Sequence, residues 1–95
     1  MIVHVIKSFW HKGLAELFEQ GRSKHVAPDL HNRCIKRLEA LDVATKVEHL
    51  NLPGFNLHLL KGKPARYSLH VNGPWCMTFE WENGQAVRVD LEQYH

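Results

Sequence analysis

The stretch KGKPARYSLHVNGPWCMTFEWENGQAVRVDLEQYH, from Lys61 to His95, decides the fold because apolar and polar residues alternate through most of it. Turn residues separate three alternating runs, with Asn-Gly-Pro after the first and Asn-Gly after the second. A side-chain period of two predicts strands that bury one face and leave the other open. The apolar side is assigned Tyr67, Leu69, Val71, Trp75, Met77, Phe79, Trp81, Val87, Val89 and Leu91. The polar side is assigned Ser68, His70, Cys76, Thr78, Arg88 and Asp90.

The second Asn-Gly turn determines how the last two runs pair. A two-residue turn sets Phe79 against Arg88, which puts a charge on the apolar side. A three-residue loop, closed by a left-handed glycine in a bulge, sets Phe79 against Val87 instead. A slip of one residue reverses every face, so we expect the longer loop. In that register Cys76 and Asp90 are cross-strand neighbours on the polar side.

The residues before this sheet predict one short strand and two helices. Residues 1–6 are mostly apolar and are interpreted as a strand. Ser8 can cap a first helix, which Gly21 ends in the left-handed conformation. A second helix begins at Pro28, the first helical position. Its apolar stripe contains Leu30, Cys34, Leu38 and Leu41, whereas Arg33, Lys36 and Arg37 fall outside that stripe.

The element order predicts an α+β fold. An apolar run over residues 55–60 adds a strand before the three alternating runs. The predicted architecture is an N-terminal strand and a two-helix hairpin packed on a mainly antiparallel sheet, which ends in a three- to four-stranded meander. A chain of 95 residues holds one core, so we expect a single domain over residues 1–95.

Composition and charge narrow the class of partner. The hydrophobic content of 44% and the charged content of 23% are ordinary for a globular protein, and no apolar run is long enough to span a membrane. Two cysteines without motif spacing favour a reducing cytoplasm. Residues 1–66 hold eleven of the twelve Lys and Arg but six of the ten acids. This asymmetry favours nucleic acid over membrane as a partner, and a merely solvated basic face is equally compatible with it.

Five segments of the chain resemble those of HigB-type toxins in the RelE/ParE toxin-antitoxin superfamily. The segments are IKSFWHKGLAELFEQG, RLEALDVAT, LNLPGFNLHLLKG, YSLHVNGPWCMTFEW and VDLEQYH. They are spread between residues 6 and 95, so the resemblance extends over nearly the whole chain, and the terminal Tyr94-His95 after an acidic strand is its most specific part. The resemblance implies a RelE-like fold and a toxin of a type II toxin-antitoxin system.

The resemblance also implies an activity and partners. The activity is that of a ribosome-dependent endoribonuclease, an mRNA interferase that enters the A site and inhibits translation. In the family mechanism the 2′-hydroxyl attacks the adjacent phosphate without a metal, so no cofactor is implied. The implied partners are a HigA-type helix-turn-helix antitoxin, the ribosome and mRNA, with operator DNA bound only through the antitoxin.

Two sets of candidate site residues follow. Cations would stabilise the phosphorane, and acidic, phenolic or imidazole groups would move or orient protons. The catalytic set contains Lys61, Asp90, Tyr94 and His95, which match family positions, and the further cations Arg66 and Arg88. The nucleic-acid-binding set contains His11 and Lys12, which match the family's His-Lys-Gly, and the basic residues Arg22, Lys24, Arg33, Lys36 and Arg37.

One departure from the family concerns the chemistry directly. Many relatives have Trp-Arg-Ile-Thr-Phe where this chain has Trp-Cys-Met-Thr-Phe, so Cys76 replaces the arginine usually assigned to phosphate stabilisation. Arg66 and Arg88 are the cations available to replace it, and the expected register favours Arg88 because it lies diagonal to Cys76. Cys76 itself is interpreted as a passive thiol, since no Cys-His-acid spacing accompanies it.

Several other interpretations stay open. His31 and Cys34 have helical metal-ligand spacing, but two further ligands at convincing positions are absent from the sequence. Trp10 can stack on a base, whereas Trp75 and Trp81 belong to the apolar side. A catalytically weakened relative that mainly binds its antitoxin, or a ParE-like gyrase inhibitor, are the alternative functions.

Overall fold

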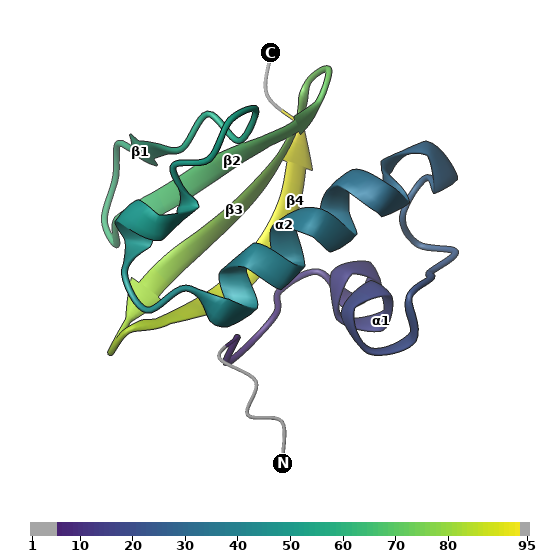
Figure 1. Ribbon diagram of the computed structural model, residues 1–95, viewed down its shortest axis with the longest axis horizontal. Helices are drawn as coiled ribbons and strands as arrows, with labels where there is room; N and C mark the ends of the chain where they lie inside the picture. Colours follow the sequence, from purple (N-terminus) through teal and green to yellow (C-terminus); the bar gives the residue numbers. More distant parts are fainter. Residues whose placement is uncertain (1–5, 94–95) are drawn as a thin grey trace.

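Four antiparallel strands form one sheet in the order of the chain (Figure 1). The computed structural model describes residues 6–93, so the strand expected at residues 1–6 lies outside the described part except for Ile6. The strands are β1 (His58–Leu60), β2 (Arg66–Asn72), β3 (Trp75–Glu82) and β4 (Gln85–Gln93). The predicted meander is confirmed, and β1 is its short edge strand.

Two helices cover one face of this sheet. Figure 1 shows α2 (His31–Val43) crossing that face, with α1 (Lys12–Gln20) beside it toward β4. Short 3-10 turns at Pro28–Leu30 and Val47–Leu50 precede and follow α2. The α+β architecture expected from the sequence is therefore confirmed. No helix in the described range of residues is long and apolar enough to cross a membrane.

The ends of α1 differ in part from those expected. Gly21 ends the helix as predicted, with φ of 80° and its N–H donating to the Leu17 carbonyl at 2.9 Å. The cap at the start is His11, whose Nδ1 accepts from the Leu14 N–H at 3.2 Å. The prediction that Ser8 caps this helix is wrong, because the Ser8 Oγ accepts instead from the Arg88 N–H at 2.8 Å.

The apolar stripe of α2 is confirmed, but one of its arginines was misplaced. Leu30, Cys34, Leu38 and Leu41 are all buried in the core. Arg37 was expected outside the stripe, yet it is only 4% exposed. α2 lies over the sheet (Figure 1), and the Arg37 side chain donates to the His70 carbonyl of β2 and to the Gly54 carbonyl.

The hairpin between β3 and β4 has the two-residue turn that was judged less favourable. Glu82 pairs with Gln85, and the central residues Asn83 and Gly84 have φ of 53° and 76°, as a type I′ turn requires. The bulge that restores the alternation lies further along β4, at Arg88, whose φ is 52°. The predicted three-residue loop is therefore wrong.

The displaced bulge changes partners along both strands. Near the turn Val87 pairs with Glu80, so Val87 lies on the polar side and its assignment to the apolar side is wrong. Ala86 lies in the core instead. Beyond the bulge the faces are as expected but the partners shift by two residues. Thr78 pairs with Asp90, and Cys76 pairs with Glu92 rather than with Asp90.

The segment before α1 runs alongside β4 in the parallel direction. Phe9 forms a bridge with Val89, and the Lys7 N–H donates to the Ala86 carbonyl at 2.8 Å. The Trp10 N–H donates to the Val89 carbonyl at 2.8 Å. This pairing brings the start of α1 to the outer edge of the sheet, close to the bulge.

Candidate active site on the open face of the sheet

The face of the sheet away from the helices carries three rows of side chains across the strands. Neighbouring rows lie two residues, or about 7 Å, apart along each strand. The first row contains Leu60, Arg66, Glu80 and Val87; the second contains His58, Ser68, Thr78 and Asp90; the third contains His70, Cys76 and Glu92. We call these residues, together with Arg88 at the bulge, the open face. The expectation that this face is left open is wrong in part, because Ser68, Thr78, Glu80 and Val87 are buried.

Arg66 is the best-anchored cation of the open face. One of its terminal nitrogens donates to Glu80 Oε2 at 2.8 Å. The other donates to Thr78 Oγ1 at 3.1 Å and to the Arg88 carbonyl at 2.9 Å. Its side chain is only 15% exposed, and the guanidinium lies 4.4 Å from the centre of the Trp10 ring. The group is therefore held in one orientation before any ligand arrives.

Glu80 joins the two arginines that the sequence offered as replacements at Cys76. Its second oxygen, Oε1, accepts from Arg88 at 3.1 Å, and the same Arg88 nitrogen reaches Glu82 at 2.8 Å. The hydrogen bond with Glu82 and that carboxylate's charge raise the pKa of Arg88. Arg88 thus lies at the turn end of the hairpin. It does not border Cys76, contrary to the expectation.

The middle row links Arg66 to the third row through one hydroxyl. Thr78 Oγ1 accepts from Arg66 and donates to Glu92. Ser68, directly across from Thr78, is fully buried, and its hydroxyl has no hydrogen-bond partner among the described residues. A chain of hydrogen bonds therefore runs from Glu80 through Arg66 and Thr78 to Glu92, and the Ser68 hydroxyl lies beside it.

Cys76 lies in the third row between His70 and Glu92 and is half-buried. The His70 Nε2 donates to the Gly73 carbonyl at 3.1 Å, so this nitrogen is used within the β2–β3 turn. The Arg66 guanidinium is linked to this row through Thr78, which donates to Glu92, whereas Arg37 donates to the His70 backbone carbonyl from the helix side. The position of the missing family arginine is thus flanked by a carboxylate and an imidazole.

The thiol of the other cysteine, Cys34, is not accessible to solvent. Cys34 is fully buried, and burial raises the pKa of its thiol to about 11, although Arg37 acts in the opposite direction.

The His31 ring nitrogen Nε2 is engaged with the Ser23 and Val26 carbonyls, at 2.9 and 2.8 Å. In the part of the chain that the structure describes, no three His, Cys, Asp or Glu side chains gather in a metal-ligating arrangement.

The predicted catalytic residues are spread along the open face rather than gathered at one point. Lys61 is exposed in the loop after Leu60, at the end of the sheet that carries Arg66. Asp90 lies in the middle row, and its Oδ1 accepts from the Leu91 N–H at 2.9 Å. The end of β4, at Gln93, pairs with Trp75, which is five residues or about 16 Å along β3 from the Arg66 row.

Tyr94 and His95 lie outside the described residues. They follow directly from Gln93, which belongs to the Cys76 end of the sheet. Their predicted role in proton transfer stays a prediction.

The sequence did not single out Glu80, Glu92 or Trp10 as part of this site. The alternation of β3 already placed Glu80 beside Thr78, and this was the available signal. The contact of Arg88 with Glu80, beside that of Arg66, depends on the bulge at Arg88, for which the sequence has no marker. Trp10 was noted only as an aromatic side chain able to stack.

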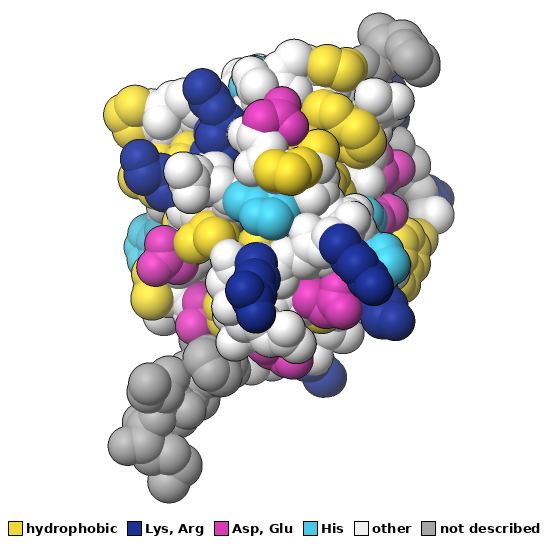
Figure 2. All heavy atoms as spheres, turned by 90° about the vertical axis from the view of Figure 1, so that its right-hand side faces the viewer, with side chains coloured by type: hydrophobic (Ala, Val, Ile, Leu, Met, Phe, Trp, Pro, Cys, Tyr) yellow, Lys and Arg dark blue, Asp and Glu magenta, His cyan; other side chains and the backbone are white. Residues whose placement is uncertain are grey.

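The predicted nucleic-acid-binding cations lie mainly on the helix side. The exposed ones are Lys12, Arg22, Lys24, Arg33 and Lys36. Figure 2 shows one side of the molecule, on which Lys and Arg are interspersed with acidic and histidine side chains rather than forming one continuous patch. Charge on this side is therefore mixed.

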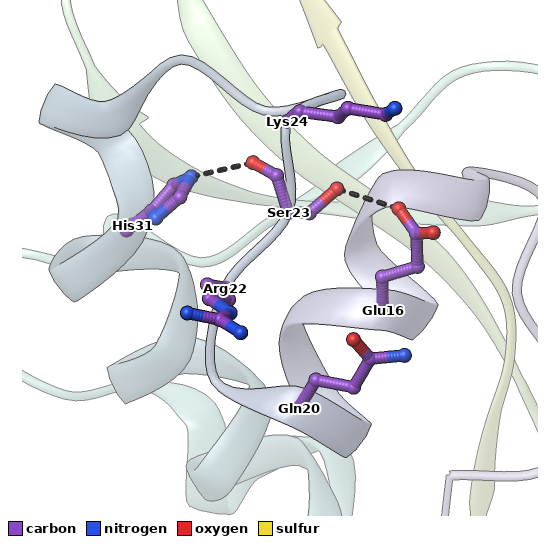
Figure 3. Close-up of a pocket in the computed structure, with 6 residues that line it drawn as sticks. All are labelled: Glu16, Gln20, Arg22, Ser23, Lys24 and His31. Atoms are coloured by element: carbon purple, nitrogen blue, oxygen red, sulfur yellow. Dashed lines mark hydrogen bonds between the residues drawn. The ribbon is translucent and has the colours of Figure 1, made fainter.

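Two hollows border these cations. A groove of about 440 Å³ is lined by Asn32, Arg33, Lys36, Arg37, Pro53, Gly54 and Phe55. A second hollow, of about 380 Å³, lies between α1 and the start of α2 (Figure 3) and is lined by Glu16, Gln20, Arg22, Ser23, Lys24 and His31. In the second hollow Glu16 already accepts from the Ser23 hydroxyl at 2.7 Å, so its carboxylate is partly engaged.

Comparisons with known proteins cover nearly the whole chain. Residues 7–95 match a family model described as the RelE-like toxin of the type II toxin-antitoxin system HigB. An endoribonuclease HigB from Proteus vulgaris is 42% identical over 92 residues, which cover 96% of this chain and 100% of that protein. A toxin HigB-1 from Vibrio cholerae serotype O1 is 27% identical over 89 residues, covering 90% of this chain and 94% of that toxin. The family match includes every residue of the open face.

Proposed function

Because the chain belongs to the HigB-like family of RelE-like toxins of type II toxin-antitoxin systems, we propose that it is an endoribonuclease that cleaves mRNA on the ribosome. Its toxicity then follows from inhibited translation, and its cognate partner is a HigA-type helix-turn-helix antitoxin. The reaction is a metal-free transesterification in which the 2′-hydroxyl attacks the adjacent phosphate. The site of this reaction is the open face.

The observation that carries this proposal is the fixed guanidinium of Arg66 on the open face. Cleavage through the 2′-hydroxyl needs positive charge where the phosphorane develops, and a donor that is already oriented is the most effective form of it. Arg66 is held by three acceptors and is mostly shielded from water. It therefore replaces Arg88 as our candidate for the function of the family arginine missing at Cys76.

The remaining roles follow from position along the sheet. Lys61 lies at the Arg66 end, where a phosphate held by Arg66 is within reach of its flexible side chain. Asp90 occupies the middle row beside Thr78. Tyr94 and His95 are proposed to assist proton transfer, since imidazole and phenol are suitable general acids or bases.

A second candidate function has one observation in its favour. Both arginines of the open face are already paired with carboxylates, because Arg66 and Arg88 share Glu80, and Arg88 also contacts Glu82. A phosphate would have to compete with these carboxylates for the guanidinium groups. This competition supports a catalytically weakened relative that acts mainly by binding its antitoxin.

Mapping mRNA ends after induction of the chain separates the two functions. We expect new 5′ ends within translated mRNA for the parent. Arg66→Ala should reduce cleavage of ribosome-bound mRNA by about a hundredfold, because a preorganised transition-state donor is lost. Arg88→Ala is the matched control, since it removes the other cation bound to Glu80, and we expect it to retain most of the activity.

The outcomes are distinct. Equal losses in Arg66→Ala and Arg88→Ala would mean that charge alone, and not the position of Arg66, supports the reaction. A parent that leaves ribosome-bound mRNA intact, together with a Cys76→Arg variant that cleaves it, would establish the weakened relative instead.

A further inference from the structure

Trp10 is 59% exposed, an uncommon position for so large an apolar side chain. Backbone hydrogen bonds hold Trp10 and the residue that follows it. The Trp10 N–H donates to the Val89 carbonyl at 2.8 Å, and the His11 N–H donates to the same carbonyl at 3.2 Å. His11 also caps α1, so Trp10 lies between the edge of β4 and the start of that helix.

Arg66 holds the indole ring in place on the open face. Its guanidinium carbon lies 4.4 Å from the ring centre, and the guanidinium is itself fixed by Glu80, Thr78 and the Arg88 carbonyl. One face of the ring is therefore covered by a cation. The exposed area must come from the other face and the edge, so a rigid aromatic surface is available to solvent.

The isolation of Trp10 indicates the kind of partner that fits it. The other large apolar side chains exposed between residues 6 and 93 are Val43, Leu52 and Leu59. They come from the end of α2, from the loop that follows, and from the helix side of β1. Protein interfaces bury a cluster of apolar residues at their centre, which Trp10 does not have around it. A lone aromatic ring beside an arginine suits a nucleotide instead.

We propose that Trp10 stacks on one base of the single-stranded RNA substrate, next to the phosphate that Arg66 contacts. Stacking on an aromatic side chain is the usual way in which proteins hold an unpaired base, and arginine adds to it. The ring and its arginine are ordered in advance, so little side-chain freedom is lost when a base binds. This inference rests on the proposed RNA-cleaving function and identifies a positioning residue for it.

A binding measurement without cleavage tests the proposal. The probe is a short single-stranded 2′-O-methyl RNA, which lacks the attacking hydroxyl, and its affinity is measured by fluorescence anisotropy. We expect Trp10→Ala to weaken binding by about tenfold, the usual effect of losing one stacked base. The salt dependence should not change, because no charge is removed. Leu59→Ala is the control, since Leu59 is equally exposed, at 58%, on the opposite face of the sheet.

A second pair of variants separates stacking from support of Arg66. Trp10→Phe and Trp10→Leu both leave an apolar side chain against the guanidinium, but only phenylalanine can stack. We expect Trp10→Phe to bind within a few-fold of the parent and Trp10→Leu to bind like Trp10→Ala. A series of probes with one abasic position each should contain one for which Trp10→Ala and the parent bind equally, since the stacked base is then already missing.

Each other result overturns the proposal. It fails if the parent does not bind the probe, if Trp10→Phe and Trp10→Leu bind equally, or if Trp10→Ala retains full RNA affinity while losing the helix-turn-helix antitoxin. The proposed function is tested separately by mRNA cleavage on ribosomes. A parent that binds the probe through Trp10 but never cleaves mRNA would contradict that function and leave the stacking intact.

Discussion

Arg37 shows how a single buried cation can join two layers of a small fold. Its Nε donates to the His70 carbonyl at 2.6 Å, and one terminal nitrogen donates to the Gly54 carbonyl at 3.3 Å. The guanidinium also lies 4.5 Å from the centre of the Phe55 ring. Burial, and then the charge of Arg33, lower the pKa of Arg37. The side chain therefore ties α2 to β2 and to the loop before β1.

Replacing Arg37 should destabilise the fold. Arg37→Ala removes the donor from the His70, Gly54 and Arg33 carbonyls and removes the contact with Phe55. An unsatisfied buried polar group costs about 1–3 kcal/mol. We expect a loss of about 3 kcal/mol in the free energy of unfolding, measured by urea denaturation. Arg33→Ala, on an exposed neighbour in the same helix, should change it by less than about 0.5 kcal/mol. Equal midpoints for the two variants would contradict this account of Arg37.

At the scale of elements, the alternation in β2 and β3 was predictable from the period of two in the sequence, although Ser68, Thr78 and Glu80 on the polar face are buried as well. The register of the last hairpin was not predictable. Both candidate turns need one bulge to keep Val89 and Leu91 in the core, and the sequence does not say where that bulge lies. The structure places it at Arg88, where the Ser8 hydroxyl accepts from the bulged N–H. A residue eighty positions away thus stabilises a local irregularity, and strand propensity carries no information about it.

Gly13 gives a test of how closely α1 packs against the loop that follows it. A Cβ at this position would lie 2.8 Å from the His11 ring and 2.9 Å from a Val26 methyl carbon. Alanine is favoured over glycine by about 1 kcal/mol within a helix, but crowding of a packed site costs about 1–3 kcal/mol. We therefore expect Gly13→Ala to lower the thermal midpoint.

The matched control for Gly13→Ala is Gln20→Ala, an exposed position in the same helix, which should leave the midpoint unchanged or slightly raised. A midpoint for Gly13→Ala above that of the parent would mean that the surrounding side chains move aside without cost.

For the whole molecule, the sequence identifies the cations, but it does not show which of them are exposed and which are engaged within the protein. Arg33 and Lys36 are exposed on α2, as the apolar stripe required. Arg37 is one residue further along the helix, but it is buried and its guanidinium donates to backbone carbonyls. On the open face, Arg66 and Arg88 are matched by Glu80 and Glu82, a pairing that appears only when β2, β3 and β4 come together. The exposed cations of the predicted nucleic-acid-binding set therefore lie mainly on the helix side, where they are interspersed with acidic side chains.

This distribution leads to the last prediction, which concerns binding to the ribosome. Arg33 and Lys36 border the groove of about 440 Å³ beside the Pro53-Gly54 turn, and both are free to contact phosphate. Reversing the two to Glu should weaken ribosome association and lower the slope of log affinity against log salt by about 2, because each phosphate contact releases about one counterion. The fold should persist, since neither side chain is buried. The control reverses Lys7 and Lys46, which are exposed elsewhere and change the net charge equally. Similar losses of ribosome co-sedimentation in both double variants would show that net charge, rather than this edge of α2, governs the association.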